Sequence, residues 1–188
     1  VACYNTSGGF LHTPLHQLLE NATASRERGI GGIKLKVGQP DRALDIRRVE
    51  AVRKHLGDDM PLMVDANQQW DRPTAQRMCR VFEDFNLVWI EEPLDAYDHE
   101  GHAALAAAFD TPIATGEMLT SAAEHADLIR HRAADVLMPD APRVGGITPF
   151  LKIAAQAEQA GLMLGPHFAM ELHVHLGAAY PTEPWVEH

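Results

Sequence analysis

The chain has 188 residues, of which 46% are hydrophobic and 22% charged, and its net charge is −10. This length corresponds to about one large globular domain. The acidic balance would repel a phosphate backbone or an anionic bilayer, and no apolar run reaches the length of a membrane span, so we expect neither nucleic acid nor membrane as a partner. The two cysteines lack metal-ligand spacing and no secretion signal is visible, which favours a reducing, cytoplasmic location.

Short apolar segments alternate with longer amphipathic segments along the whole chain. We predict strands at residues 1–7, 32–37, 61–65, 87–91, 112–116, 135–139, 162–166 and, more weakly, 183–187. We predict helices between them at about residues 14–28, 41–56, 72–85, 99–109, 121–132, 148–160 and 169–179. This alternation is typical of an α/β protein with a parallel sheet.

Eight parallel strands can close into a barrel or open into a doubly wound sheet, and composition does not distinguish the two. No Gly-x-Gly-x-x-Gly follows a strand, and the sequence has no Walker loop, nucleophile elbow or His-Glu-x-x-His. Nucleotide binding, serine hydrolysis and zincin chemistry therefore lack their usual evidence. The remaining signal is a set of charged residues at the ends of the predicted strands.

Three acidic residues follow consecutive strands at equal spacing. Asp65 ends one strand, Glu91 ends the next 26 residues later, and Glu117 follows the third after another 26. Adjacent strands of a parallel barrel lie about 4.8 Å apart, so the three carboxylates would converge at the catalytic rim. Such a group needs a cation, and its all-oxygen ligands favour Mg²⁺ over Zn²⁺. The alternative is that each acid is a helix N-cap or a solvated loop residue.

Two lysines occupy alternate positions of the second strand. Lys34 and Lys36 therefore share one face, which on a barrel strand is the interior. Proximity to each other and to a metal would lower the pKa of either lysine and make it available as a general base. An edge strand with a charged face is the alternative.

Asp140 and His167 end the sixth and seventh strands, and we expect them to form a dyad in which the carboxylate fixes the imidazole tautomer. The other ten of the 11 histidines are expected to be structural or exposed. A metal-bound substrate would lie between the lysines and His167. This arrangement suits removal of a proton next to a carboxylate, followed by racemisation or by loss of a β-hydroxyl.

These residues resemble the mandelate racemase subgroup of the enolase superfamily across essentially the whole chain. The resemblance rests on Lys34-x-Lys36, Asp65-Ala-Asn67, Glu91-Glu92-Pro93, Gly116-Glu117, Asp140 and His167. It implies a modified TIM barrel, (β/α)7β, over residues 1–188. Stretches such as Gly-Gly-Ile-Lys-Leu-Lys-Val and Val-Asp-Ala-Asn-Gln-Gln-Trp-Asp resemble dehydratases of the six-carbon aldarates galactarate and L-talarate.

The resemblance also implies roles for the residues. The implied Mg²⁺ ligands are Asp65, Glu91 and Glu117. Lys36 and the His167–Asp140 pair would be the opposing acid/base catalysts. They would remove the α-proton and the β-hydroxyl of an acid sugar to give a keto-deoxy acid, with epimerisation through the shared enediolate.

Three further residues would contact the substrate. Lys34 would help to neutralise its carboxylate. Glu187 matches the position of an acid that hydrogen-bonds the substrate carboxylate in mandelate racemase, and Asn67 either contacts the substrate or caps the end of its strand. Members of the subgroup form symmetric assemblies, which implies a homo-oligomer such as an octamer.

Members of the subgroup also carry an N-terminal α+β capping domain and a C-terminal segment that completes the cap. The chain begins near the first predicted strand and ends at His188, just after the eighth. We therefore expect a catalytic barrel cut from a longer enzyme, lacking both parts. The alternatives are another sugar-acid dehydratase, racemase or epimerase of the subgroup, and a truncated barrel that binds metal or partners without turnover.

Overall fold

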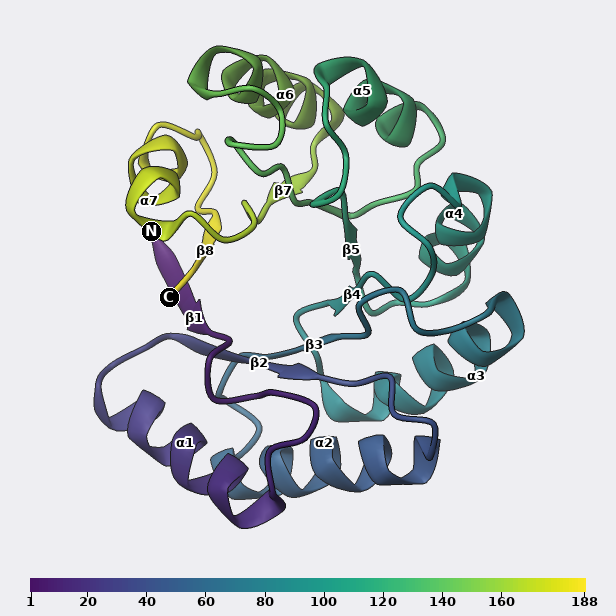
Figure 1. Cartoon of the computed structure of the whole chain (residues 1–188), viewed down its shortest axis with the longest axis vertical. Helices are drawn as coiled ribbons and strands as arrows, with labels where there is room; N and C mark the ends of the chain where they lie inside the picture. Colours follow the sequence, from purple (N-terminus) through teal and green to yellow (C-terminus); the bar gives the residue numbers. More distant parts are fainter.

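The computed structural model describes residues 1–188 and contains eight strands and seven α-helices. The strands are β1 (Ala2–Asn5), β2 (Gly32–Lys36), β3 (Leu62–Asp65), β4 (Ile90–Glu91), β5 (Ile113–Thr115), β6 (Val136–Leu137), β7 (Met163–Leu164) and β8 (Trp185–Glu187). The helices are α1 (Leu15–Glu27), α2 (Arg42–Leu56), α3 (Arg72–Phe82), α4 (His99–Ala108), α5 (Ala122–Arg130), α6 (Ile147–Ala160) and α7 (Met170–Ala178). The strands form a ring and the helices lie outside it (Figure 1).

The strand order identifies a barrel. All pairs are parallel and follow the order β7-β6-β5-β4-β3-β2-β1-β8, with β1 paired to both β2 and β8. A doubly wound sheet would reverse its order partway, so this alternative is excluded. The predicted (β/α)7β topology is confirmed. The two end strands, β7 and β8, form no ladder with each other, so the barrel is nearly closed and has a seam between them.

Several predicted elements are shorter in the structure. The strand predicted at 87–91 is reduced to the two residues of β4, although Val88 still donates its N–H to the carbonyl oxygen of Leu62 at 2.8 Å. The helix predicted at 72–85 is α-helical only to Phe82 and ends in a 3₁₀ turn, η1 (Glu83–Phe85). The turn stops there because Asn86 adopts a left-handed conformation, with φ of 48°.

The hydrophobic core lies in two places. Two large clusters fill the space between the strands and the surrounding helices, and Ile33, Leu35 and Val37 of the β2 segment belong to the larger one. A smaller cluster fills the barrel interior and consists of Tyr4, Met63, Trp89, Ala114, Val136 and Met138. The barrel is therefore solid below its mouth, as the fold requires.

None of the helices has the combination of length and apolar composition needed to cross a bilayer.

Candidate active site

The three predicted acids converge at the barrel mouth. Asp65 and Glu91 are the last residues of β3 and β4 and face each other in register, and Glu117 lies two residues beyond β5. Ligand oxygens of the three lie within 4.8 Å of one another, and all three side chains are buried. Gly116 has φ of +125°, a conformation that favours glycine and that turns the chain into the mouth before Glu117.

The alternative reading of these acids as helix N-caps is wrong. The helices that follow the three strands are capped by Asp71, Asp98 and Ser121, whose side chains accept hydrogen bonds from first-turn N–H groups. The acids at the strand ends are therefore free to face one another.

The acid cluster is electrostatically strained without a cation. Burial, followed by the neighbouring charge of Asp65, raises the pKa of Glu91 well above its usual value, although Lys34 opposes this shift. Burial alone would also raise the pKa of Asp65, but Lys34 and Lys36 lower it. The two lysines therefore do not fully offset the repulsion among the three carboxylates. A Mg²⁺ ion would offset it, and carboxylate oxygens are ligands that Mg²⁺ prefers.

Lys34 is buried at the centre of this network. Its Nζ donates hydrogen bonds to both carboxylate oxygens of Glu91, each at 2.8 Å, and to Oε1 of Glu187 at 2.9 Å. It also lies 5.2 Å from the centre of the Tyr4 ring. Burial opposes its charge, but Glu91 and the other surrounding groups outweigh burial and raise the pKa of Lys34. The predicted fall in the pKa of either lysine depends on a metal beside them and stays a prediction; the protein groups alone raise the pKa of Lys34, because carboxylates from three strands enclose it.

Lys36 points the same way from β2 but lies nearer the rim. Its side chain is 23% exposed, against 1% for Lys34, and its Nζ is hydrogen-bonded to Oδ2 of Asp65. Since β2 is flanked by β1 and β3, the edge-strand alternative is wrong. The two lysines are thus divided into a buried cation and an accessible one.

The expected His–Asp pair forms on the opposite side of the mouth. Nδ1 of His167 lies 2.9 Å from Oδ2 of Asp140, and Nε2 lies 3.4 Å from Oε2 of Glu117. The imidazole is 20% exposed. Its Nδ1 is therefore held by Asp140, while Nε2 faces the acid cluster.

A second histidine braces the two loops that carry this pair. Buried His173 of α7 has its Nδ1 2.8 Å from the carbonyl oxygen of Phe168, and its Nε2 accepts a hydrogen bond from the N–H of Ala141 at 3.1 Å. These contacts require a neutral ring protonated on Nδ1. His173 therefore ties the residue after Asp140 to the residue after His167, a structural role of the kind expected for it.

Glu187 and Asn67 make contacts within the protein. The carboxylate of Glu187 accepts from Lys34 through Oε1 and from the N–H of Phe168 through Oε2, at 2.6 Å. Asn67 has φ of 43°, and its N–H donates to Oδ1 of Asp65 at 2.8 Å. The contact of either residue with a substrate stays a prediction.

The site also contains three residues to which the sequence patterns give no role: Trp89, Gln68, and Glu92, which stands in the Glu91-Glu92-Pro93 motif. Trp89 donates its indole N–H to Glu91 at 3.0 Å, and its position two residues before Glu91 on one strand face is a usable signal. Glu92 is buried and accepts from the side chain of Gln68 at 2.9 Å; burial and the charge of Glu117 raise its pKa to about 8. Its left-handed φ of 38° interrupts the alternation of side chains along the strand, so the sequence does not predict which way the Glu92 side chain points.

Comparison with known proteins places this geometry in a family. The family described as "Enolase C-terminal domain-like" matches residues 17–188. L-talarate/galactarate dehydratase of Salmonella typhimurium is 72% identical over 188 residues, which are 100% of this chain and 47% of the relative. A 3,6-anhydro-alpha-L-galactonate cycloisomerase of Streptomyces coelicolor is 38% identical over 96% of this chain and 50% of its own length.

The structural comparison agrees. The crystal structure of L-talarate dehydratase from Polaromonas sp. JS666, complexed with Mg and L-glucarate, superposes with a TM-score of 0.98 at 87% identity; the match covers 100% of this chain and 52% of that one. The chain thus spans about half the length of the relatives it matches.

Proposed function

The chain belongs to the enolase C-terminal domain-like family, and on that premise we propose that it is the catalytic barrel of a Mg²⁺-dependent acid-sugar dehydratase. The proposed substrates are the six-carbon aldarates galactarate and L-talarate. The observation that carries the proposal is a cluster of three buried carboxylates with a lysine on one side and a histidine on the other. The high identity to L-talarate/galactarate dehydratase supports the choice of substrate.

Asp65, Glu91 and Glu117 are the proposed metal ligands because they offer only carboxylate oxygens and lie together in a buried site. When bound, Mg²⁺ would polarise the substrate carboxylate and so make its α-proton more acidic. Lys34, whose raised pKa keeps it charged, would add a second positive charge beside that carboxylate.

The two accessible bases divide the proton transfers between two faces of the substrate. Lys36 reaches the mouth from β2 and His167 reaches it from the loop after β7, so each exchanges a proton on its own side. Asp140 would hold Nδ1 of His167 and leave Nε2 for the transfer. When Lys36 removes the α-proton, His167 is placed to protonate the departing β-hydroxyl. Exchange on both faces would also permit epimerisation.

We further propose that residues 1–188 are the barrel domain of a longer cytoplasmic enzyme that acts as a homo-oligomer. His167 and Lys36 are partly exposed in this chain. Exclusion of water from the mouth would strengthen every electrostatic interaction described above. Closure by other parts of the full-length protein would supply it.

The proposal is tested by assaying the full-length enzyme with Mg²⁺ against a panel of acid sugars. We expect dehydration of galactarate or L-talarate that disappears on chelation. Turnover of an aldonate but of neither aldarate would refute the substrate assignment.

The two-base mechanism has a separate test in solvent-deuterium exchange. Lys36→Ala and His167→Asn should each abolish or sharply reduce exchange at the α-carbon on one substrate face. Unchanged exchange in both variants would contradict the assignment of the bases.

A further inference from the structure

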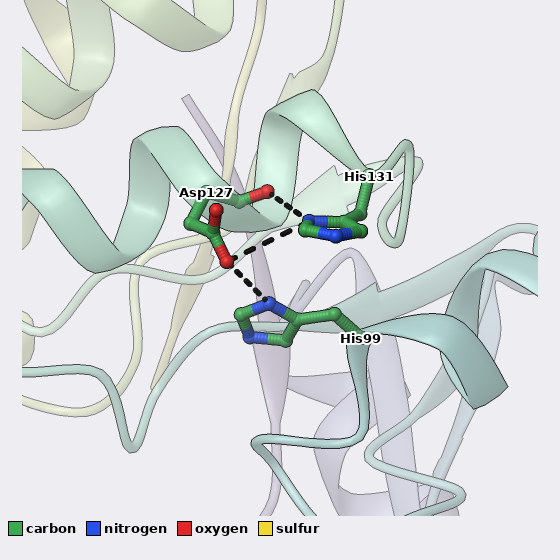
Figure 2. A group of neighbouring side chains, drawn as sticks. All are labelled: His99, Asp127 and His131. Carbon is green, nitrogen blue, oxygen red and sulfur yellow. Dashed lines mark hydrogen bonds and ion pairs between the residues drawn. The ribbon is translucent and has the colours of Figure 1, made fainter.

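A second group of potential metal ligands lies between two helices outside the ring of strands (Figure 1). It consists of His99, the first residue of α4, with Asp127 and His131 at the end of α5 (Figure 2). One ligand atom from each residue lies within 4.8 Å of the others. The group shares no residue with the acid cluster, and it joins two neighbouring helices that have no backbone hydrogen bonds to each other.

The spacing of the donor atoms suits a small tetrahedral ion. Oδ2 of Asp127 lies 3.2 Å from Nδ1 of His99 and 3.6 Å from Nδ1 of His131. Zinc–nitrogen and zinc–oxygen bonds of about 2.0–2.1 Å in a tetrahedron separate neighbouring ligands by about 3.3–3.4 Å. The observed distances lie on either side of this value, so one ion can bridge the carboxylate and both rings after small side-chain adjustments.

The chemistry of the three ligands differs from that of the mouth. Two imidazoles and one carboxylate prefer a borderline divalent ion such as Zn²⁺, whereas three carboxylates prefer Mg²⁺. The other carboxylate oxygen of Asp127, Oδ1, is hydrogen-bonded to Arg130, which leaves Oδ2 for a metal. His131 is half-exposed at the end of its helix, so its ring can release its 2.9 Å contact with the carbonyl oxygen of Asp127.

We propose that His99, Asp127 and His131 form a second metal site, specific for Zn²⁺-like ions, that clamps α4 to α5. Solvent water completes the coordination, because only three protein ligands are present. The guanidinium of Arg130 limits the affinity, since it places a positive charge next to the ion. Zn²⁺ coordinates an imidazole only through an unprotonated nitrogen, so protons compete with the ion for both rings and affinity rises with pH.

The test is a calorimetric Zn²⁺ titration of the purified protein. Excess Mg²⁺ is present throughout, so that the acid cluster is already filled. Exposed His131 and partly buried Asp127 are suitable positions for substitution because neither is in the core. His131→Gln and Asp127→Asn should each weaken Zn²⁺ binding by ~10-fold or more. His175→Gln, which removes an exposed histidine from α7, is the matched control and should leave binding unchanged.

Arg130→Gln provides the sharpest readout. Removing the guanidinium should tighten Zn²⁺ binding, whereas loose association with any surface imidazole would be insensitive to it. Equal Zn²⁺ affinity in the wild-type protein, His131→Gln and Arg130→Gln would overturn the proposal. Loss of the bound Zn²⁺ in Glu117→Gln with retention in His131→Gln would instead place the ion at the barrel mouth, and would also overturn it.

Discussion

The two sides of the barrel mouth are held in different ways. On the lysine side, β2 and β3 pair in register from Ile33 with Leu62 to Lys36 with Asp65, so the backbone ladder fixes the active groups. On the histidine side, β7 has only two residues and no ladder with β8. There the loop after β7 is held to β8 and α7 by Phe168, whose N–H bonds to Glu187 and whose carbonyl oxygen contacts His173.

The lysine side is therefore tied to the stability of the whole barrel, whereas the contacts of the histidine side mainly position one loop. A ladder distributes its free energy over many hydrogen bonds, so disturbing the lysine side should affect the unfolding of the whole barrel. The histidine side depends on a few side chains, and losing one of them should open a single loop while the rest of the barrel stays folded.

The largest effect is expected from Lys34→Met. This change removes the ammonium group that Glu91 and Glu187 share, so the two buried carboxylates lose the positive charge between them and keep only their neutral donors, Trp89 and the N–H of Phe168. We expect the free energy of unfolding to fall by about 3–5 kcal/mol, measured by urea denaturation without metal. Lys152→Met, which replaces an exposed lysine of α6, is the control and should change little. A loss as small as that of the control would show that Lys34 does not stabilise the lysine side.

A smaller and more local effect is expected from Glu187→Gln. Its amide has one oxygen, while Lys34 and the N–H of Phe168 are both donors, so one of them loses its acceptor. The cost is about 1–3 kcal/mol. Hydrogen exchange should accelerate at the Phe168 amide but not in β2 or β3. Glu183→Gln, at an exposed position, is the control; equal acceleration in all strands would contradict a local role.

The smallest effect is expected from mild acidification. Burial lowers the pKa of His102, His125 and His173, so each contributes stability that is present above its unfolded-state pKa and lost as the pH falls through its lower folded-state value. A fall to about pH 6 should cost less than about 1 kcal/mol per histidine. Protonated His173 cannot accept from Ala141, so the protection factor of this amide, relative to the free-amide rate at each pH, should fall while β2 and β3 stay protected. The raised pKa values of Glu91 and Glu92 act on global stability in the opposite direction, so the local readout decides, and unchanged protection of the Ala141 amide would contradict the prediction.

The sequence predicts the parts of the site that depend on strand period and strand order. Asp65, Glu91 and Glu117 end consecutive strands, and Lys34 and Lys36 are two residues apart, so parallel pairing alone brings them together. The element order follows from the alternation of apolar and amphipathic segments, whereas the choice of a barrel over a doubly wound sheet rests on the motifs at the strand ends.

Other parts depend on side chains that meet only after the barrel forms. The direction of the Lys34 pKa shift reflects acids on three strands, including Glu187, which lies 153 residues away. The partner of Oε2 of Glu187 is a backbone N–H, which has no residue signature. The seam is equally hidden, because residues 162–166 have the apolar character of a full strand although only Met163–Leu164 pair.

The seam also gives the ring two ends. A fully closed barrel has no strand from which it can fray, whereas this sheet runs from β7 to β8 and has β4 and β3 at its centre. Asp65 and Glu91 are therefore carried by the two strands farthest from either end. Thermal fraying should begin at β7 and β8 and reach β3 and β4 last. The part of the mouth that carries these two acids should therefore be the last to unfold.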